Sequence, residues 1–456
     1  DFLQNKDGTP MNASKRPILA VDKVRHVGDP VVFILADTTN QALDASELIE
    51  ISYDELPCVT DTSKALNSDS PILFEEFGSN SAVDWELGSE DEWKMVEDKA
   101  DHISKVDLIN NRIVVNPIEP RSAISDYNKD NNHFTVYVES QGSHAMRERL
   151  AGSLGVEEKN IKVVTNDVGG GFGLKMMCFP EYVATMFASR ALKRPVKWTS
   201  TRSEAFLSDS HGRDHVTEAS IAMDKEGNFL GVKVDTVAAV GAYLSQYGIF
   251  IPTLAGAGMH VGVYKIPVLY NKVNVVYTNT VPVDAYRGAG RPEASYVIER
   301  LVDKAADDLG IDPVELRVKN FVQPDEIGKH EGAILPLDSC DFQKTTEMSM
   351  VNSSYEDFLK RKEESKLENK LKGIGISYYI ERTQGEGAEN SRVVISGEGS
   401  VKVFAGTQAT GQGHETAWTQ ILVEKLGVNP EDVSIHFGNS DDLPGGGGTG
   451  GSKSLY

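Results

Sequence analysis

Two glycine-rich stretches decide how this chain is expected to fold: Asp167-Val-Gly-Gly-Gly-Phe-Gly173 and Gly445-Gly-Gly-Gly-Thr-Gly-Gly-Ser452. Each stretch ends a segment with the same order of features. A β-branched and aromatic run, beginning at Phe134 or Val401, leads to a glutamine; a helical stretch then ends in Leu-Gly-Val, and a second apolar run precedes the glycines. Each segment is therefore predicted to form strand, glutamine-bearing turn, helix, strand and glycine-rich loop.

The two loops point to an anionic ligand. Glycine lets main-chain N–H groups approach an anion without side chains in the way, and a helix N-terminus adds partial positive charge. Two matched loops would present such donors to one shared ligand that is large, polar and phosphorylated. A single glycine run is also typical of a surface turn, so it is the repetition in matched context that favours a binding site.

Composition limits the classes of function. A chain of 456 residues exceeds what one hydrophobic core usually supports, so two or three domains are expected. The net charge of -22 argues against nucleic acid or an anionic membrane as partner. Cys58, Cys178 and Cys340 are too far apart in sequence for an iron-sulfur or structural zinc motif, and such sparse cysteine use fits a reducing, cytoplasmic location.

The chain divides into four parts of mixed α/β (α+β) character. Residues 1–62 are predicted to form a small α/β domain with strands at 31–36 and 49–53 around a helix at 39–49. Residues 63–110 are acidic and weakly periodic, which indicates a connector. A large mixed domain is expected over 111–345, and the start of a second one over 346–456.

One helix is especially well marked. Residues 292–309 carry a single apolar stripe at helical spacing, with Pro292 suited to the first turn and Gly310 to the C-terminal cap. A second helix is predicted from Asp312 and Pro313. Residues 354–372 are rich in lysine and glutamate and are expected to form an exposed helix between domains.

An arginine-containing turn precedes the well-marked helix. Arg287 and Arg291 flank the run Gly288-Ala-Gly290 at a helix N-terminus, which combines guanidinium donors with main-chain N–H groups. An anionic centre would be well served there. Alternatively, the two arginines cap neighbouring carbonyls or pair with Glu293.

Three motifs resemble the molybdenum-binding large subunit of the xanthine dehydrogenase and aldehyde oxidase family. They are Asp167-Val-Gly-Gly-Gly-Phe-Gly173, Ala285-Tyr-Arg-Gly-Ala-Gly-Arg291 and Gly411-Gln-Gly-His-Glu-Thr416. Within that family the likeness is strongest to the large subunits of the aerobic carbon monoxide dehydrogenase type. Supporting matches, in the family's order, are Val27-Gly-Asp-Pro-Val-Val32, Glu119-Pro-Arg-Ser122, Arg202-Ser-Glu204, His211-Gly-Arg-Asp214 and Gly448-Thr-Gly-Gly-Ser452.

This resemblance implies a fold and a chemistry. Residues 1–62 would be a truncated hammerhead-like domain, followed by a first molybdopterin-binding domain and an incomplete second one. The protein would be a molybdenum hydroxylase that oxidises a small-molecule substrate with water as the oxygen source. Its cofactor would be molybdenum held by the dithiolene of molybdopterin cytosine dinucleotide, with no metal ligand from protein side chains. Partners would be an FAD-binding medium subunit and an iron-sulfur small subunit carrying 2Fe-2S clusters, assembled as a dimer of heterotrimers.

The resemblance also implies roles for individual residues. Gln141 would donate its amide to an oxo ligand, Arg287 would stabilise charge on the substrate side, and Phe172 would lie beside the metal. As an alternative, Gln141 is an ordinary strand-end amide, Phe172 a core aromatic and His414 a structural histidine. The expected cofactor-binding residues are Gly170, Gly171, Phe172, Gly173, Gly288, Ala289, Gln412, Gly413, His414, Thr449, Gly450, Gly451 and Ser452.

Two departures from the family's pattern matter. The copper-containing carbon monoxide oxidisers have a cysteine where this chain has Gly288, so an aldehyde or an N-heterocycle is favoured as substrate. The family's general-base glutamate lies beyond the second glycine loop, and Glu381, Glu386 and Glu389 lack its context. We therefore expect the chain to be inactive alone: either it is a fragment of a longer subunit, or a separate polypeptide completes the site. The alternatives are a non-catalytic cofactor carrier, or an unrelated nucleotide-binding enzyme, against which the lack of a Gly-Lys-Ser/Thr loop weighs.

Overall fold

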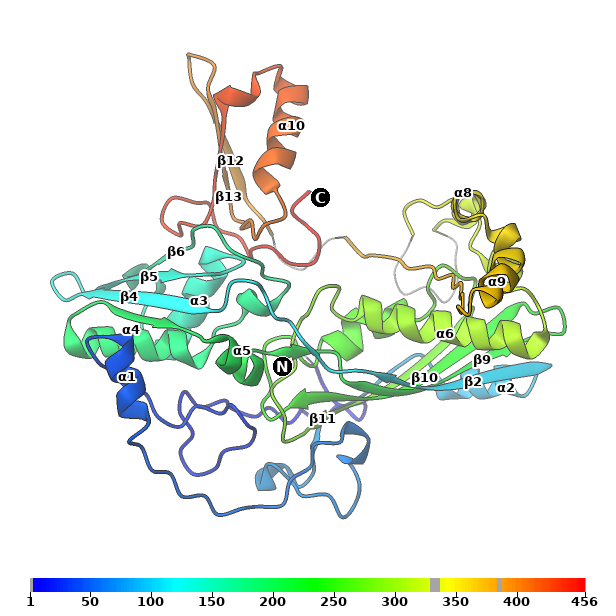
Figure 1. Cartoon of the computed structure of the whole chain (residues 1–456), viewed down its shortest axis with the longest axis horizontal. Helices are drawn as coiled ribbons and strands as arrows, with labels where there is room; N and C mark the ends of the chain where they lie inside the picture. Colours follow the sequence, from blue (N-terminus) through cyan, green and yellow to red (C-terminus); the bar gives the residue numbers. More distant parts are fainter. Residues whose placement is uncertain (1–2, 329–336, 384–387, 456) are drawn as a thin grey trace.

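The computed structural model describes residues 3–328, 337–383 and 388–455. Two sheet-and-helix layers make up most of the molecule, and a third unit with β12, β13 and α10 projects from one of them (Figure 1). The element order is mixed α/β throughout, so the predicted fold class is confirmed.

The larger layer is a five-stranded sheet in the order β1-β11-β10-β9-β2. Helix α6 packs on one side of it against β2 and β9, and α2 on the other against β10 and β11. The apolar stripe of α6, including Val297, Leu301 and Ala305, is buried there against Ile221 and Val234 of the sheet. The elements are β1 (Ser81–Leu87), α2 (Glu90–Glu97), β2 (His102–Asn110), β9 (His215–Met223), β10 (Phe229–Gly241), β11 (Val268–Tyr277) and α6 (Arg291–Leu309).

The second layer is a four-stranded sheet in the order β6-β5-β4-β7, covered by two helices. Its core joins Phe134 and Val136 of the sheet to Met146 and Leu150 of α3 and to Met186 of α4. The elements are β4 (Ser122–Asn128), β5 (His133–Val138), α3 (Ser143–Leu154), β6 (Ile161–Val164), α4 (Pro180–Leu192), β7 (Val196–Thr199) and the short helix α5 (Arg202–Ser208). A two-stranded ladder of β3 (Ile113–Val114) and β8 (His211–Gly212) pairs the two chain segments that connect the layers.

The projecting unit is smaller and more exposed. Its sheet has the order β12-β13-β14, and α10 packs against β14. The elements are β12 (Ser391–Ile395), β13 (Val401–Ala405), α10 (His414–Leu426) and β14 (Val433–His436).

The helical predictions in the middle of the chain are confirmed closely. Helix α6 begins one residue before Pro292, and Gly310 ends it in the left-handed conformation with φ 65°. Helix α7 (Pro313–Asn320) is capped by the Asp312 side chain. Residues 354–372 contain the exposed helix α9 (Phe358–Leu367), which follows α8 (Phe342–Ser353).

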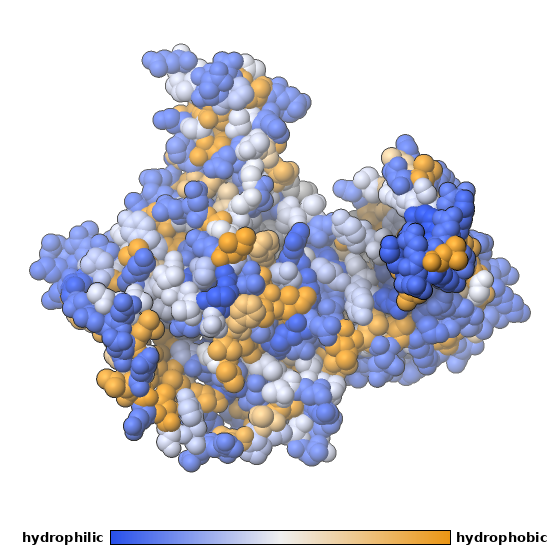
Figure 2. All heavy atoms as spheres, viewed as in Figure 1, coloured by the Kyte–Doolittle hydropathy of each residue, from blue (hydrophilic) through white to orange (hydrophobic). Residues whose placement is uncertain are grey.

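The predicted strands of the N-terminal domain are wrong. Helix α1 (Thr39–Ser46) forms, but residues 31–36 and 49–53 are extended chain without ladder partners in the described part of the molecule. An apolar run becomes a strand only where another strand lies beside it. Many apolar side chains of the N-terminal domain are exposed, such as Val27 at 75% and Leu48 at 83%. In Figure 2, apolar surface is visible in the lower part of the view, where the N-terminal domain lies.

The expected acidic connector is also corrected. Within residues 63–110, β1 pairs with β11 and β2 pairs with β9, so this segment supplies two strands of the larger sheet. Trp93 of α2 is 2% exposed and packs against Ala222 and Tyr270. The sequence pattern did not reveal these strands because the elements are short and charged residues occupy their exposed positions, which weakens the periodicity.

The boundary expected at residue 345 is crossed by contacts. Tyr378 and Ile380 pack against the core around α6, and the Tyr378 N–H donates to Glu299 at 2.9 Å. Among the described residues, no helix is long and apolar enough to cross a membrane.

Candidate functional site

The duplicated segments fold as predicted, and the repeat is longer than the sequence indicated. In one unit, the parallel strands β5 and β6 are connected by α3. In the other, the parallel strands β13 and β14 are connected by α10. Each unit also has an antiparallel strand in front, β4 beside β5 and β12 beside β13. Gln141 and Gln408 both follow the strand before the helix.

The two units meet where their second strands end. The Thr165 N–H donates to the Gly438 carbonyl at 2.8 Å, and the Ser440 N–H donates to the Val163 carbonyl at 3.0 Å. Val164 and Asn439 form an antiparallel bridge between them. Because each glycine loop follows one of these ends, the junction brings the two loops together.

Gln141 connects both loops. Its Oε1 accepts the Gly173 N–H at 2.9 Å, and its Nε2 donates to the Thr449 carbonyl at 2.8 Å. The Thr449 N–H in turn donates to the Gln141 carbonyl at 2.6 Å. These partners fix which side of the amide carries the nitrogen, and one N–H of Nε2 stays available. Gln141 is 5% exposed and lies between the two loops. Its expected hydrogen bond to an oxo ligand stays a prediction.

The first loop needs its glycines. A Cβ at Gly171 would lie 2.6 Å from Gln141 Oε1, and one at Gly173 would lie 2.3 Å from the Ala285 carbonyl oxygen. Gly173 has φ 105°, which side chains rarely adopt. Phe172 is 44% exposed, so the alternative that it is a core aromatic is wrong.

The arginine turn lies directly against this loop. The Arg287 N–H donates to the Phe172 carbonyl at 2.9 Å. The buried Arg213 side chain makes two hydrogen bonds to this turn. Its Nη1 donates to the Tyr286 carbonyl and its Nη2 to the Arg287 carbonyl, each at 2.8 Å. Arg213 also pairs with Glu293 at 2.9 Å. Glu293 is thus paired with Arg213, a residue of the matched motif at 211–214 to which the sequence analysis gave no role.

Arg287 and Arg291 therefore differ. Arg291 Nη1 donates to the Ala289 carbonyl at 3.0 Å, as the alternative of carbonyl capping predicts. The Arg287 guanidinium has no hydrogen-bond or ion-pair partner among the described residues. Gly288 has φ 94°, and a Cβ there would lie 2.5 Å from Pro292 Cγ. Ala289 also has a positive φ, 39°, which indicates a backbone strained by this tight turn.

Gln412, Gly413 and His414 form a separate group at the start of α10. Gln412 Oε1 accepts the Thr410 N–H at 2.6 Å, and its Nε2 lies 3.0 Å from His414 Nε2. Burial lowers the pKa of His414, whose ring stacks on Trp418. His414 is thus consistent with a structural histidine. Trp418 donates to the carbonyl of Ser454, two residues after the second loop, at 3.0 Å. A cavity shared by Gln412 and Gly171 stays a prediction.

The second loop is anchored through Thr449. The Thr449 hydroxyl donates to the Gln408 carbonyl, so the glutamines of both units contact the same residue. Gly450 lies against Met176, whose Sδ would be 3.1 Å from a Cβ there. Gly451 and Ser452 have φ 64° and 56°, and Ser452 donates to Glu381 at 3.0 Å. Glu386 lies outside the described residues.

Main-chain donors around these loops fit an anionic group. In the described structure the N–H groups of Gly170, Gly171, Phe172, Gly450 and Gly451 have no acceptor. The first turns of α3 and α10 also have no side-chain cap. Uncapped helix starts and unpaired loop amides attract phosphate and similar anions. The donor set therefore suits a phosphorylated ligand.

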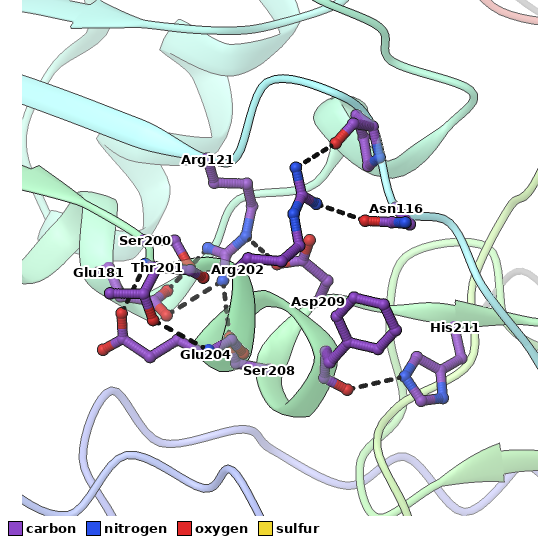
Figure 3. Close-up of polar contacts among 12 residues, drawn as sticks. Asn116, Arg121, Glu181, Ser200, Thr201, Arg202, Glu204, Ser208, Asp209 and His211 are labelled. Carbon is purple, nitrogen blue, oxygen red and sulfur yellow. Dashed lines mark hydrogen bonds and ion pairs between the residues drawn. The ribbon is translucent and has the colours of Figure 1, made fainter.

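A polar frame supports the segment in front of β4, and sequence reasoning gave its residues no role (Figure 3). Arg202 Nη2 donates to the carbonyls of Pro117 at 2.7 Å and Ile118 at 2.8 Å. Arg121 is fully buried and pairs with Asp209 at 2.6 Å and Glu181 at 3.0 Å. Burial opposes the charge on Arg121, but its acidic neighbours outweigh it and hold the pKa above the usual value. Within the matched motifs at 119–122 and 202–204, Arg121 and Arg202 therefore have structural partners.

Family models match most of the chain. Residues 73–321 and 349–456 match two models described as molybdopterin cofactor-binding domain. Residues 2–57 match a model described as aldehyde oxidase and xanthine dehydrogenase, a/b hammerhead domain.

Curated relatives and solved structures agree with these models. The gamma subunit of the 6-hydroxypseudooxynicotine dehydrogenase complex of Paenarthrobacter nicotinovorans is 31% identical over 96% of this chain and 55% of its own length. The carbon monoxide dehydrogenase large chain of Afipia carboxidovorans is 31% identical over 99% and 61%. The structure of quinoline 2-oxidoreductase from Pseudomonas putida 86 superposes with a TM-score of 0.89 at 28% identity, covering 95% of this chain and 56% of its own. The chain therefore spans little more than half the length of these relatives.

Proposed function

This chain belongs to the molybdopterin cofactor-binding family of aldehyde oxidases and xanthine dehydrogenases, and we propose that it forms the catalytic, cofactor-binding part of a molybdenum hydroxylase. The proposed reaction oxidises an aldehyde or an N-heterocycle with water as the oxygen source. The observation that carries this proposal is the position of Gln141 between two glycine loops whose amides are free to bind an anion. When bound, the molybdenum cofactor would supply the two-electron oxidation chemistry.

The residues of this chain would bind and orient. The amides of residues 170–172 and 450–452, together with the first turn of α10, would hold the pterin and its phosphates, in the proposed cytosine dinucleotide form. Gln141 would donate its remaining Nε2 hydrogen toward the metal centre without bringing charge. Gly170, Gly171 and Gly173 keep side chains out of that space.

Arg287 and Phe172 would face the substrate. The Arg287 guanidinium has no partner in the described structure, so its charge is available to stabilise negative charge that develops on a substrate oxygen. Phe172 is exposed, and its carbonyl accepts the Arg287 N–H. Its ring offers a surface against which a planar heterocycle can lie.

The proposed substrate class follows from Gly288. A Cβ there would lie 2.5 Å from Pro292 Cγ, so a cysteine at this position would require the turn to shift. The similarity to a nicotine 6-hydroxylase large subunit and to quinoline 2-oxidoreductase supports an N-heterocycle. Carbon monoxide is a less suitable substrate without a soft copper ligand.

The proposed partners carry the other redox centres. Two of the relatives are named as the gamma subunit of a complex and as a large chain, which supports separate FAD and 2Fe-2S subunits here. We propose a dimer of such heterotrimers in the cytoplasm.

Elemental analysis combined with a dye-reduction assay tests the function. The full-length complex is expected to hold molybdenum without stoichiometric copper and to reduce dye with aldehydes or N-heterocycles. Arg287→Met should retain molybdenum and lose at least about a hundredfold in kcat/KM, whereas Arg300→Met, on an exposed face of α6, should match the wild type. Stoichiometric copper would reject the substrate class, and bound molybdenum with no activity on a broad panel would favour a non-catalytic carrier.

A further inference from the structure

A carboxylate placed just before β4 holds the first glycine loop at both ends. One oxygen of Glu119, Oε2, accepts the Gly169 N–H at 2.7 Å and lies 2.8 Å from Lys175 Nζ. The Glu119 N–H also donates to the Gly169 carbonyl at 3.1 Å. A Cβ at Gly169 would lie 2.5 Å from Glu119 Cβ, so loop and carboxylate are in close contact. The Lys175 side chain is fully buried.

A second carboxylate does the same for the second glycine loop. Glu389, just before β12, uses its Oε1 to accept the Gly448 N–H at 2.8 Å and to pair with Lys453 Nζ at 2.7 Å. Glu389 and Gly446 also form an antiparallel main-chain bridge. A Cβ at Gly446 would lie 2.2 Å from Glu389 Oε2. The Lys453 side chain is 9% exposed.

The two arrangements are equivalent positions of the repeat. Each glutamate precedes the first, antiparallel strand of its unit, and each lysine follows the glycine loop of the same unit. In each pair a single carboxylate oxygen accepts both a glycine N–H and a lysine Nζ. Glu381 and Glu389, considered in the sequence only as possible bases, thus have structural partners in the second loop.

Such a pair restricts a loop that would otherwise be free. Glycine has more accessible backbone conformations than any other residue, and hydrogen bonds to an ionised carboxylate are stronger than neutral ones. A carboxylate beside an anion-binding loop would repel the anion, but the paired lysine offsets its charge. The loop is therefore held in shape without a net negative charge.

We propose that Glu119 and Glu389 are equivalent positioning residues that, each with its lysine, fix the two glycine loops in the shape that binds the anionic part of the cofactor. This inference rests on the proposed function. Neither glutamate contacts the cofactor in this proposal; both act through the main chain of residues 169–173 and 446–448.

The test uses hydrogen exchange and molybdenum content of the full-length complex carrying Glu119→Gln or Glu389→Gln. Exchange should rise by about tenfold or more in the loop that the altered glutamate holds, and by much less in the other loop. Molybdenum content should fall several-fold in both variants. Glu398→Gln is the matched control, because Glu398 lies exposed in the turn between β12 and β13.

Lysine variants separate charge balance from simple packing. Lys175→Met leaves the Glu119 charge uncompensated beside the loop, so it should lose more molybdenum than the double variant Glu119→Gln/Lys175→Met. Loops that exchange as in Glu398→Gln would overturn the inference, as would faster exchange with unchanged molybdenum content. A wild-type complex without molybdenum would instead reject the proposed function itself.

Discussion

The unit built on β4, β5, α3 and β6 and the unit built on β12, β13, α10 and β14 run through the same elements, but their surroundings differ. Helix α3 buries Met146, Leu150 and Ala151, whereas α10 buries His414 alone. All five residues of β12 are exposed, and this unit projects from the body in Figure 1. Both loops nevertheless have a glutamine, a glutamate and a lysine in matching places. Loop shape thus depends on local polar contacts, while burial depends on neighbouring elements.

The junction between the units is expected to be the position most sensitive to substitution. Gly438→Ala would place Cβ 2.0 Å from the Thr165 carbonyl oxygen, at φ 84°. Since backbone atoms cannot move aside easily, the change should lower the free energy of unfolding by about 4 kcal/mol or more. Thermal denaturation measures this. Gly411→Ala, with φ 104° but open space around it, isolates the conformational cost and should lose only about 1 kcal/mol.

Substitutions at equivalent positions of α3 and α10 should differ in their cost to stability, with the larger loss in α3. Leu150 of α3 is fully buried, while Leu422 of α10 is half-buried. Leu150→Ala should cost about 3 to 4 kcal/mol, and Leu422→Ala no more than about half of that. Denaturant unfolding of both variants compares them. Equal losses would mean that α10 is as well covered in solution as α3.

A fall in pH should destabilise the body of the molecule, which consists of the two sheet-and-helix layers, more than the projecting unit. Burial, with the charge of Arg112, lowers the pKa of His211 to about 4, and burial lowers the pKa of His260 to about 4. An unfolded histidine titrates near 6.5, so the unfolded state takes up protons first and the fold loses stability as the pH falls below about 6.5. Between about pH 7.5 and pH 6 the loss should be about 1.5 kcal/mol for the two groups.

Hydrogen exchange at the two pH values, corrected for the intrinsic rate, locates this loss. Protection in β10 should fall more than protection in β13, because the described part of the projecting unit contains one buried histidine, His414, whose pKa burial also lowers. A pH-independent stability of the body would contradict the neutral, buried state of His211 and His260.

The smallest effect is expected on the exposed strand. Val393 of β12 is 49% exposed, so Val393→Thr removes little buried apolar surface and should change the free energy of unfolding by less than about 0.5 kcal/mol. A larger loss in thermal denaturation of the full-length complex would show that another part of the assembly covers β12.

The sequence was most informative where its signals are local or repeated. The glycine loops, the helices between them and the stripe of α6 depend on residues close in the chain, and the structure has all of them. The strands expected at 31–36 and 49–53 failed because strand formation depends on a distant partner. Residues 81–110 were misjudged for the same reason, since β11 lies far along the chain.

For the site, sequence reasoning found the residues that contact one another but missed those that support them. Gln141, Gly173, Phe172, Arg287 and Thr449 are joined by hydrogen bonds. Arg213, Glu119 and Glu389 were not assigned roles because their partners are far away in sequence. One signal was available: a lysine follows each glycine loop, at Lys175 and Lys453.

The hydrogen bond from Gln141 to Thr449 joins residues that are 308 positions apart. During synthesis, Gln141 and the first glycine loop leave the ribosome long before Thr449 of the second loop has been added. The nascent chain therefore holds half of the loop pair with no counterpart. The contact between the two loops can therefore form only after translation has passed the second loop.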